Sequence, residues 1–162
     1  MKSAVERAGR VGADPERQLK RFISKFEPRS QALINSARRI LKRRFPTANE
    51  LVYDNYNFFV IGYSPTERPS DTVVSLAAAA NGVGLSFYRG STLPDPQHIL
   101  LGSGKQNRFI RIAAAETFAR PEVQALITAA VAQARAPLRL NGRGKLIIRS
   151  VSAKQRPRRP KV

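Results

Sequence analysis

Cysteine is absent from this 162-residue chain, and histidine occurs once, as His98. Without cysteine the chain has no disulfides and no thiolate chemistry, and a reducing cytoplasm is its simplest setting. A single histidine without any cysteine cannot form a histidine–cysteine metal site. No apolar run approaches the ~20 residues that a membrane span needs, and the Arg-rich N-terminus lacks the apolar centre of a secretory signal. The sequence therefore predicts a cytoplasmic protein with no membrane contact, no metal site and no cofactor.

Acidic residues are scarce: 11 Asp and Glu stand against 29 Lys and Arg, which gives a formal net charge of +18. The excess is confined to the two ends of the chain. Residues 1–45 carry 13 basic and 4 acidic residues, residues 46–137 carry 7 of each, and residues 138–162 carry 9 basic and no acidic residues. This segregation predicts basic arms on an ordinary domain.

Helix-like and strand-like patterns follow one another along the middle of the chain and predict a single α+β domain. The predicted helices open at Asp14-Pro15, span residues 29–45 and span residues 121–135. The predicted strands span residues 51–56, 58–63 and 105–112, with a hairpin around Asn81-Gly82. The chain thus divides into a disordered basic N-terminus (1–13), a domain (14–137, with its core in 28–136) and a basic tail (138–162).

The clearest local signal is the β-hairpin with Asn81-Gly82 as its turn, because Asn-Gly tolerates the positive φ that a tight turn needs. This register pairs Ala80 with Val83, Ala78 with Leu85 and Leu76 with Phe87. It places large apolar side chains on one side and small or polar side chains on the other. The first set is Val74, Leu76, Leu85 and Phe87, and the second is Ser75, Ala77, Gly84, Ser86 and Tyr88.

After the hairpin, Asp95 is predicted to cap a short helix that Gly102 ends. The Gly102-Ser103-Gly104-Lys105 run lacks the spacing of a Walker loop and leads from a helix into a strand, where a Walker loop does the reverse. Ser103 has no base partner in the sequence pattern, and no pair of carboxylates stands out for acid–base work. The chain is therefore expected not to be an enzyme.

Three features together resemble the YdhG-like family of small bacterial domains of unknown function. They are the stretch LPDPQHILLGSGKQNRFIRI at 93–112, the DNYN run at 54–57 and the helix at 121–135. The resemblance covers roughly residues 28–136. It implies a frataxin-like sandwich, an antiparallel twisted sheet with N- and C-terminal helices packed on one face. Some family members are described as iron chaperones, so the resemblance offers metal or small-ligand handling as an alternative function.

Frataxins bind iron through an acidic ridge on the first core helix and the first strand. In this chain the matching strand offers only Glu50 and Asp54, and the matching helix is basic, with Arg38, Arg39, Lys42, Arg43 and Arg44. Hard cations need oxygen ligands, and a ridge of positive charge repels them. We therefore expect this chain to share the frataxin-like fold but not the iron site.

Two sets of residues are candidates for binding. The polyanion-binding candidates lie on the basic face of the second helix and in the tail: Arg38, Arg39, Lys42, Arg43, Arg143, Lys145, Arg149, Lys154, Arg156, Arg158 and Arg159. On the helix, the alternative is a solvated face whose cations suit the C-terminal end of the helix dipole. The candidates for a small-ligand pocket are Tyr53, Asp54, Asn55, Lys105, Arg108 and Arg111. For the polar run at 54–57, a turn that satisfies its own backbone is the favoured alternative.

The basic tail is predicted to have two parts. Lys145 to Val151 contains four aliphatic residues and is predicted to dock as an added strand on the sheet edge, whereas Ser152 to Val162 is predicted to stay mobile. The uncharged back of the last helix offers at most a weak homodimer contact, so a monomer or weak homodimer is expected. The sequence favours a non-enzymatic module whose basic flanks engage a polyanion such as nucleic acid, with little sequence selectivity because the arms have few aromatic residues.

Overall fold

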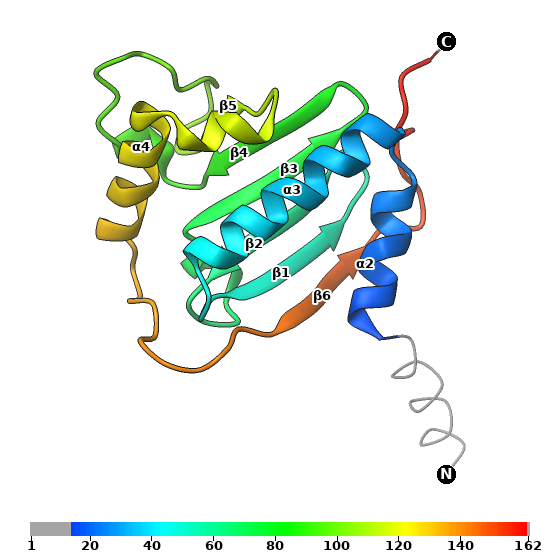
Figure 1. The fold of residues 1–162 in the computed structure, drawn as a ribbon, viewed down its shortest axis with the longest axis horizontal. Helices are drawn as coiled ribbons and strands as arrows, with labels where there is room; N and C mark the ends of the chain where they lie inside the picture. The colour runs from blue at the N-terminus through cyan, green and yellow to red at the C-terminus, as the bar shows by residue number, and fades with distance from the viewer. Residues whose placement is uncertain (1–13, 162) are drawn as a thin grey trace.

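A six-stranded mixed sheet and three α-helices form the fold of residues 14–161, the part of the chain that the computed structural model describes (Figure 1). The helices are α2 (Pro15–Ser24), α3 (Pro28–Arg44) and α4 (Pro121–Ala132). The strands are β1 (Asn49–Asp54), β2 (Phe59–Ser64), β3 (Val74–Ala79), β4 (Gly82–Phe87), β5 (Arg108–Arg111) and β6 (Leu146–Val151), in the sheet order β5-β4-β3-β2-β1-β6. The predicted α+β class is confirmed. The predicted disorder of residues 1–13 lies outside the described residues.

All three helices pack on one face of the sheet, where α3 lies over the strands and runs along them, with α2 and α4 on either side of it (Figure 1). Each helix begins at a proline, whose fixed φ suits the first helical turn. The helices bury these apolar stripes: Leu19, Phe22 and Ile23 from α2, Ile34, Ala37 and Leu41 from α3, and Val123, Leu126, Ile127 and Ala130 from α4. We name the helix-covered side of the sheet the inner face and the other side the open face. None of the described helices is both long and apolar enough to cross a membrane.

The β3–β4 hairpin is confirmed, but its register differs by two residues from the predicted one. Ala79 pairs with Gly82 and Leu76 with Leu85, so Ala80 and Asn81 are the turn residues. Neither turn residue has a positive φ, whereas Gly82, directly after them, has a φ of 141°. Because the shift is an even number of residues, every side chain stays on its predicted face.

The predicted short helix between Asp95 and Gly102 is wrong, and turns take its place. The Asp95 carboxylate accepts hydrogen bonds from the backbone N–H groups of Ile99 and Leu100, both at 2.9 Å. Within this turn His98 takes a positive φ of 53°. A short polar side chain that binds nearby backbone groups competes with helix formation, which explains the difference. The next strand, β5, is also shorter than predicted.

Strand β6 confirms that residues 146–151 dock on the sheet as an added strand. It pairs with β1 in parallel, so the prediction of a wholly antiparallel sheet is wrong. The connection from α4 reaches the sheet at the start of β1, where Lys145 N donates to Asn49 Oδ1 at 2.9 Å and Thr47 Oγ1 donates to the Arg139 carbonyl at 2.7 Å. The chain therefore enters β6 at the same end as β1, which gives the parallel direction.

The segment after β6, residues 152–161, also packs on the domain, so the prediction of a mobile end is wrong. Ser152 N and Gln155 Nε2 donate to the Asp54 carbonyl at 2.9 and 2.7 Å. Arg158 is 4% exposed, and its Nη2 donates to Asp54 Oδ1 at 2.9 Å. The segment lacks large apolar residues, but it docks through polar bonds to a buried aspartate. Composition does not reveal such bonds.

Candidate nucleic-acid interface

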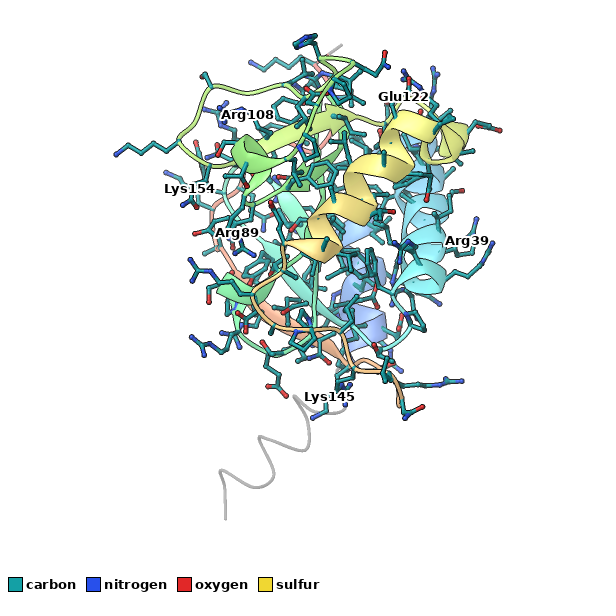
Figure 2. All side chains as sticks on the ribbon, turned by 90° about the vertical axis from the view of Figure 1, so that its left-hand side faces the viewer. Arg39, Arg89, Arg108, Glu122, Lys145 and Lys154 are labelled. Carbon is teal, nitrogen blue, oxygen red and sulfur yellow. The ribbon has the colours of Figure 1, made fainter. Side chains whose placement is uncertain are left out.

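Exposed cations lie on both sides of the sheet in the described part of the chain (Figure 2). Arg39 projects from the outer surface of α3, whereas Lys154 and Arg108 lie on the opposite side of the molecule. Arg39, Lys42 and Arg43 are exposed and form no ion pair with any described carboxylate. The structure therefore keeps these three helix candidates together on the solvent side of α3.

Arg38, the fourth helix candidate, is held against the sheet. Its Nε and Nη2 donate to the carboxylate of Glu50 at 2.9 Å each, and its Nη1 and Nη2 donate to Glu16 at 3.1 and 2.9 Å. Burial lowers the pKa of Arg38, but the hydrogen bonds and charges of Glu50 and Glu16 outweigh it and raise the pKa above its ordinary value. Arg38 is therefore held by two carboxylates, and little of its side chain faces solvent, unlike its three neighbours on α3.

Asp54, a predicted pocket residue, is the centre of a second ion-pair cluster. Its side chain is 0% exposed, with Lys25 Nζ 2.6 Å from Oδ2 and Arg158 Nη2 2.9 Å from Oδ1. Burial raises the pKa of Asp54, but hydrogen bonds from Lys25, Arg158 and Gln155 outweigh it and lower the pKa. We name this cluster the Asp54 clasp, because it joins α2, β1 and the C-terminal segment. It removes Asp54 from the pocket candidates and Arg158 from the exposed polyanion candidates.

The open face of the sheet is hollowed along the β3–β4 hairpin. Its floor consists of the small residues that alternate with the buried ones on these two strands: Ser75, Ala77, Ala79, Gly82, Gly84 and Ser86. Larger side chains form the walls, with Phe58 and Val60 on the β2 side and Phe109 and Arg111 on the β5 side. This sheet hollow has a volume of about 410 Å³.

A second hollow adjoins the sheet hollow at the hairpin turn. It has a volume of about 400 Å³, and three cations of the C-terminal segment line it, Arg156, Arg159 and Lys161. Phe58 and Asn81 line both hollows. We name the second one the basic hollow. The Asp54 clasp anchors the segment that carries its cations, so they are held beside the sheet and do not sit on a free arm.

Exposed aromatic rings lie next to the two hollows. Tyr56 and Phe58, in the connection between β1 and β2, are 46% and 49% exposed. The Arg156 guanidinium lies 5.7 Å from the centre of the Tyr56 ring, and that of Arg111 lies 5.8 Å from the centre of the Phe109 ring, distances at which a cation and a ring attract. Among residues 14–161, α2, α3 and α4 carry no exposed large apolar side chain. The helical side therefore offers cations without exposed aromatic rings.

Of the predicted pocket residues, neither Tyr53 on β1 nor Asn55 directly after it lines either of the two hollows. Tyr53 interacts with Arg149; burial raises the pKa of Tyr53, and the positive charge of Arg149 acts in the opposite direction. Asn55 N donates to the Phe58 carbonyl at 3.0 Å, and Asn55 Oδ1 accepts from Ser150 Oγ at 2.7 Å. The first of these bonds confirms the favoured alternative, a turn that satisfies its own backbone.

Among the three predicted pocket cations, the structure places only Arg111 at a hollow. Lys105 is exposed in the loop before β5. Arg108 Nη1 donates to the carbonyls of Gly104 and Asn107 at 2.6 and 2.8 Å, so it closes that same loop. The six candidates thus do not form one pocket.

The remaining tail candidates are spread along the chain from the connection after α4 to Arg159, which directly follows the clasp residue Arg158. Lys145 Nζ lies 3.4 Å from Glu67 Oε2 in an exposed ion pair, and Arg143 is exposed on the connection before it. Lys154 is exposed just after β6, and Arg159 Nε donates to the Lys25 carbonyl at 3.2 Å. Of the tail candidates, Arg156 and Arg159 are the two that reach a hollow beside exposed aromatic rings.

Sequence reasoning missed the aromatic walls of the site. The alternation in the hairpin does predict the floor, because it assigns Ser75, Ala77 and Gly84 to the water-facing side. The walls depend on which strands flank the hairpin, and no pattern in the sequence states that β2 and β5 do. A run of only small residues on one strand face was the available signal, since such a face can be hollow only if its neighbours carry larger side chains.

Within residues 14–161, no three His, Cys, Asp or Glu side chains are grouped closely enough to hold a metal ion. Glu50 and Asp54, the two carboxylates of β1, are each bound to cations of the protein itself. No family model matches the chain, and no curated protein and no solved structure matches it significantly.

Proposed function

We propose that this chain is a non-enzymatic domain that binds nucleic acid through its surface cations. The observation that carries the proposal is the distribution of the ion pairs. Several described carboxylates already have a cation of the same chain as partner: Glu16 and Glu50 share Arg38, Asp54 has Lys25 and Arg158, Glu67 has Lys145 and Glu122 has Arg120. The acidic groups are therefore partly neutralised, while many cations face solvent without a partner among the described carboxylates. Such a surface attracts a polymer of regularly spaced negative charge.

Phosphate is the anionic group that best fits the cations present. Among the exposed cations, arginine outnumbers lysine on α3 and equals it in the C-terminal segment, and the planar guanidinium of arginine binds two phosphate oxygens at once. We also propose that the sheet is of the frataxin-like kind that the resemblance to YdhG-like domains implies. The packing of all helices on one face supports this finer assignment, whereas no observation favours an iron site.

The test is fluorescence anisotropy of labelled oligonucleotides of two unrelated sequences between 50 and 200 mM salt. If ~6 phosphates are contacted, we expect the affinity to fall by about 10³ over this range, with little difference between sequences. Two triple variants locate the interface: R39Q/K42Q/R43Q on α3 and R111Q/R156Q/R159Q at the hollows. Each variant removes three positive charges. A larger loss of affinity in one of them therefore identifies the face that binds, since the change in net charge is the same in both. Absent binding at 50 mM, or an affinity indifferent to salt, would contradict the proposal.

A further inference from the structure

We infer that the two hollows bind single-stranded nucleic acid, with unpaired bases over the sheet hollow and phosphates on the cations of the basic hollow. This inference rests on the proposed function and names the substrate class and the face that binds it. Three observations carry it: the fixed aromatic edge between the hollows, the charge of their linings and the shape of the floor.

The aromatic edge is built into a hydrogen-bonded connection. Phe58 is 49% exposed and lines both hollows. The turn that carries it is closed by the bond from Asn55 N to the Phe58 carbonyl at 3.0 Å, and the bond from Arg156 N to the Tyr56 carbonyl at 2.9 Å ties it to the C-terminal segment. Because the backbone of this turn is already fixed, little main-chain freedom is lost when a base stacks on the Phe58 ring. Stacking also accepts every base, because each has a π-face.

The charge of the linings selects an anion. None of the described residues that line the two hollows is acidic. Arg111 stands at one wall of the sheet hollow, and Arg156, Arg159 and Lys161 line the basic hollow. A second copy of the chain placed on this face would set like charges against each other, which is costly. A nucleic-acid strand instead supplies phosphates for the cations and bases for the rings.

The shape of the site favours single strands over duplexes. In a duplex the faces of the bases are covered by their neighbours, so a ring at the edge of a hollow cannot stack on them. In a single strand the bases can be splayed out and stacked on aromatic side chains. The floor of the sheet hollow, made of Ser75, Ala77 and Gly84 among others, leaves room above the strands for a flat group. Close packing against β5 also restricts the size of the residue at position 84, because a Cβ at Gly84 would lie 3.1 Å from the Ile110 carbonyl oxygen.

The first experiment compares one labelled sequence as single strand and as duplex, at one salt concentration, by anisotropy with the full chain. We expect tighter binding of the single strand. F58A should weaken single-strand binding roughly 5- to 150-fold, the range found for alanine substitution at stacking residues, and should leave duplex binding unchanged. A77L should also weaken it, because it fills the floor of the hollow. The matched controls are L140A, at an exposed apolar residue outside both hollows, and A32L, at an exposed residue of α3.

The second experiment uses the absence of tryptophan from the chain. F58W introduces a single tryptophan at the aromatic edge, which can be excited selectively over the four tyrosines, and a stacked base should quench its emission during titration with unlabelled oligo(dT). L140W gives the matched control and should not be quenched. Thermal melts of all variants establish that each is folded.

The outcomes separate the two proposals. Equal affinity for both forms of the oligonucleotide, with no effect of F58A or A77L and no quenching in F58W, overturns this inference and leaves the proposed function standing. The inference is also overturned if the single strand is preferred but its binding is weakened by R39Q/K42Q/R43Q and not by F58A. The helical side would then be the binding face. Failure of both forms to bind at 50 mM salt overturns the proposed function and the inference together.

Discussion

Replacing Arg158 by methionine should destabilise the whole domain, although the residue lies in a segment whose composition predicts mobility. The substitution keeps an unbranched side chain but removes the bond from Nη2 to Asp54 Oδ1, whose two side chains are 2% and 0% exposed. Breaking a buried ion pair from one side typically costs ~3–5 kcal/mol, because the other charge stays buried without its partner.

We expect a loss near the lower end of that range, for two structural reasons. Lys25 Nζ remains 2.6 Å from Asp54 Oδ2, so the aspartate keeps one cation. The Nε and Nη1 atoms of Arg158 are buried without hydrogen-bond partners among residues 14–161, so methionine also relieves a desolvation cost. A loss of about 3 kcal/mol corresponds to a fall in melting temperature of roughly 6–12 °C for a domain of this size.

The assay is thermal unfolding at several pH values, with R159M as the matched control. Arg159 is exposed and its Nε donates to the Lys25 carbonyl at 3.2 Å, so R159M should change stability by less than about 0.5 kcal/mol. The pKa of Asp54 is lowered in the folded protein from its ordinary value of 3.8. The clasp therefore contributes fully above the unfolded-state pKa, and its contribution is lost as the pH falls through the lower folded-state pKa. The difference in unfolding free energy between wild type and R158M should be constant near neutral pH and should become smaller below about pH 4.

Two results would refute this reasoning. If R158M and R159M melt at the same temperature at pH 7, the C-terminal segment does not stabilise the domain through Asp54. If the difference in stability between wild type and R158M persists unchanged in acid, the loss comes from packing or from the bond that Arg158 Nη2 donates to the Asn55 carbonyl at 2.6 Å, and not from the ion pair.

The remaining predictions concern the approach to β6 and the iron alternative. G144A should cost roughly 1–3 kcal/mol in a denaturant melt, because a Cβ at Gly144 would collide with the Ala48 carbonyl, whereas G104A, with no atom within 4 Å of its new Cβ, should be neutral. Equal stability of these two variants would mean that the Gly144–Ala48 approach is not tight. Anaerobic calorimetric titration with ferrous iron should show no saturable micromolar site; a site that disappears in E50Q/D54N would restore the chaperone function.

Local patterns predicted the secondary structure well wherever a single element carried the signal. The proline-led helices, the alternation in the hairpin and the four aliphatic residues of 145–151 each placed an element correctly. Asp95 misled because its carboxylate can either cap a helix or close a turn, and the two have the same sequence signature. For the hairpin, the predicted strand register was wrong but the predicted faces were right, since Asn-Gly can occupy different positions of a turn without changing which face is buried.

The candidate site was less predictable because its parts come from distant segments. The cations Arg156 and Arg159 were identified from charge, but their position depends on the burial of Arg158 against Asp54, 104 residues away. The charge pattern could not separate Arg38, which binds Glu16 and Glu50, from its exposed neighbours on α3. Which arginine is structural and which is free depends on where the few carboxylates lie in space.

The parallel pairing of β6 with β1 has a consequence for synthesis of the chain. Strands β1 to β5 pair in chain order, each with the next, so these contacts can form as the polypeptide emerges. The bond between Lys145 and Asn49 joins residues 96 positions apart, so the outer edge of β1 stays unpaired until β6 has been made. Until then a row of unpaired backbone groups can recruit strands from neighbouring nascent chains. Protection from aggregation on the ribosome is therefore delayed until residues 146–151 have been translated and have closed that edge.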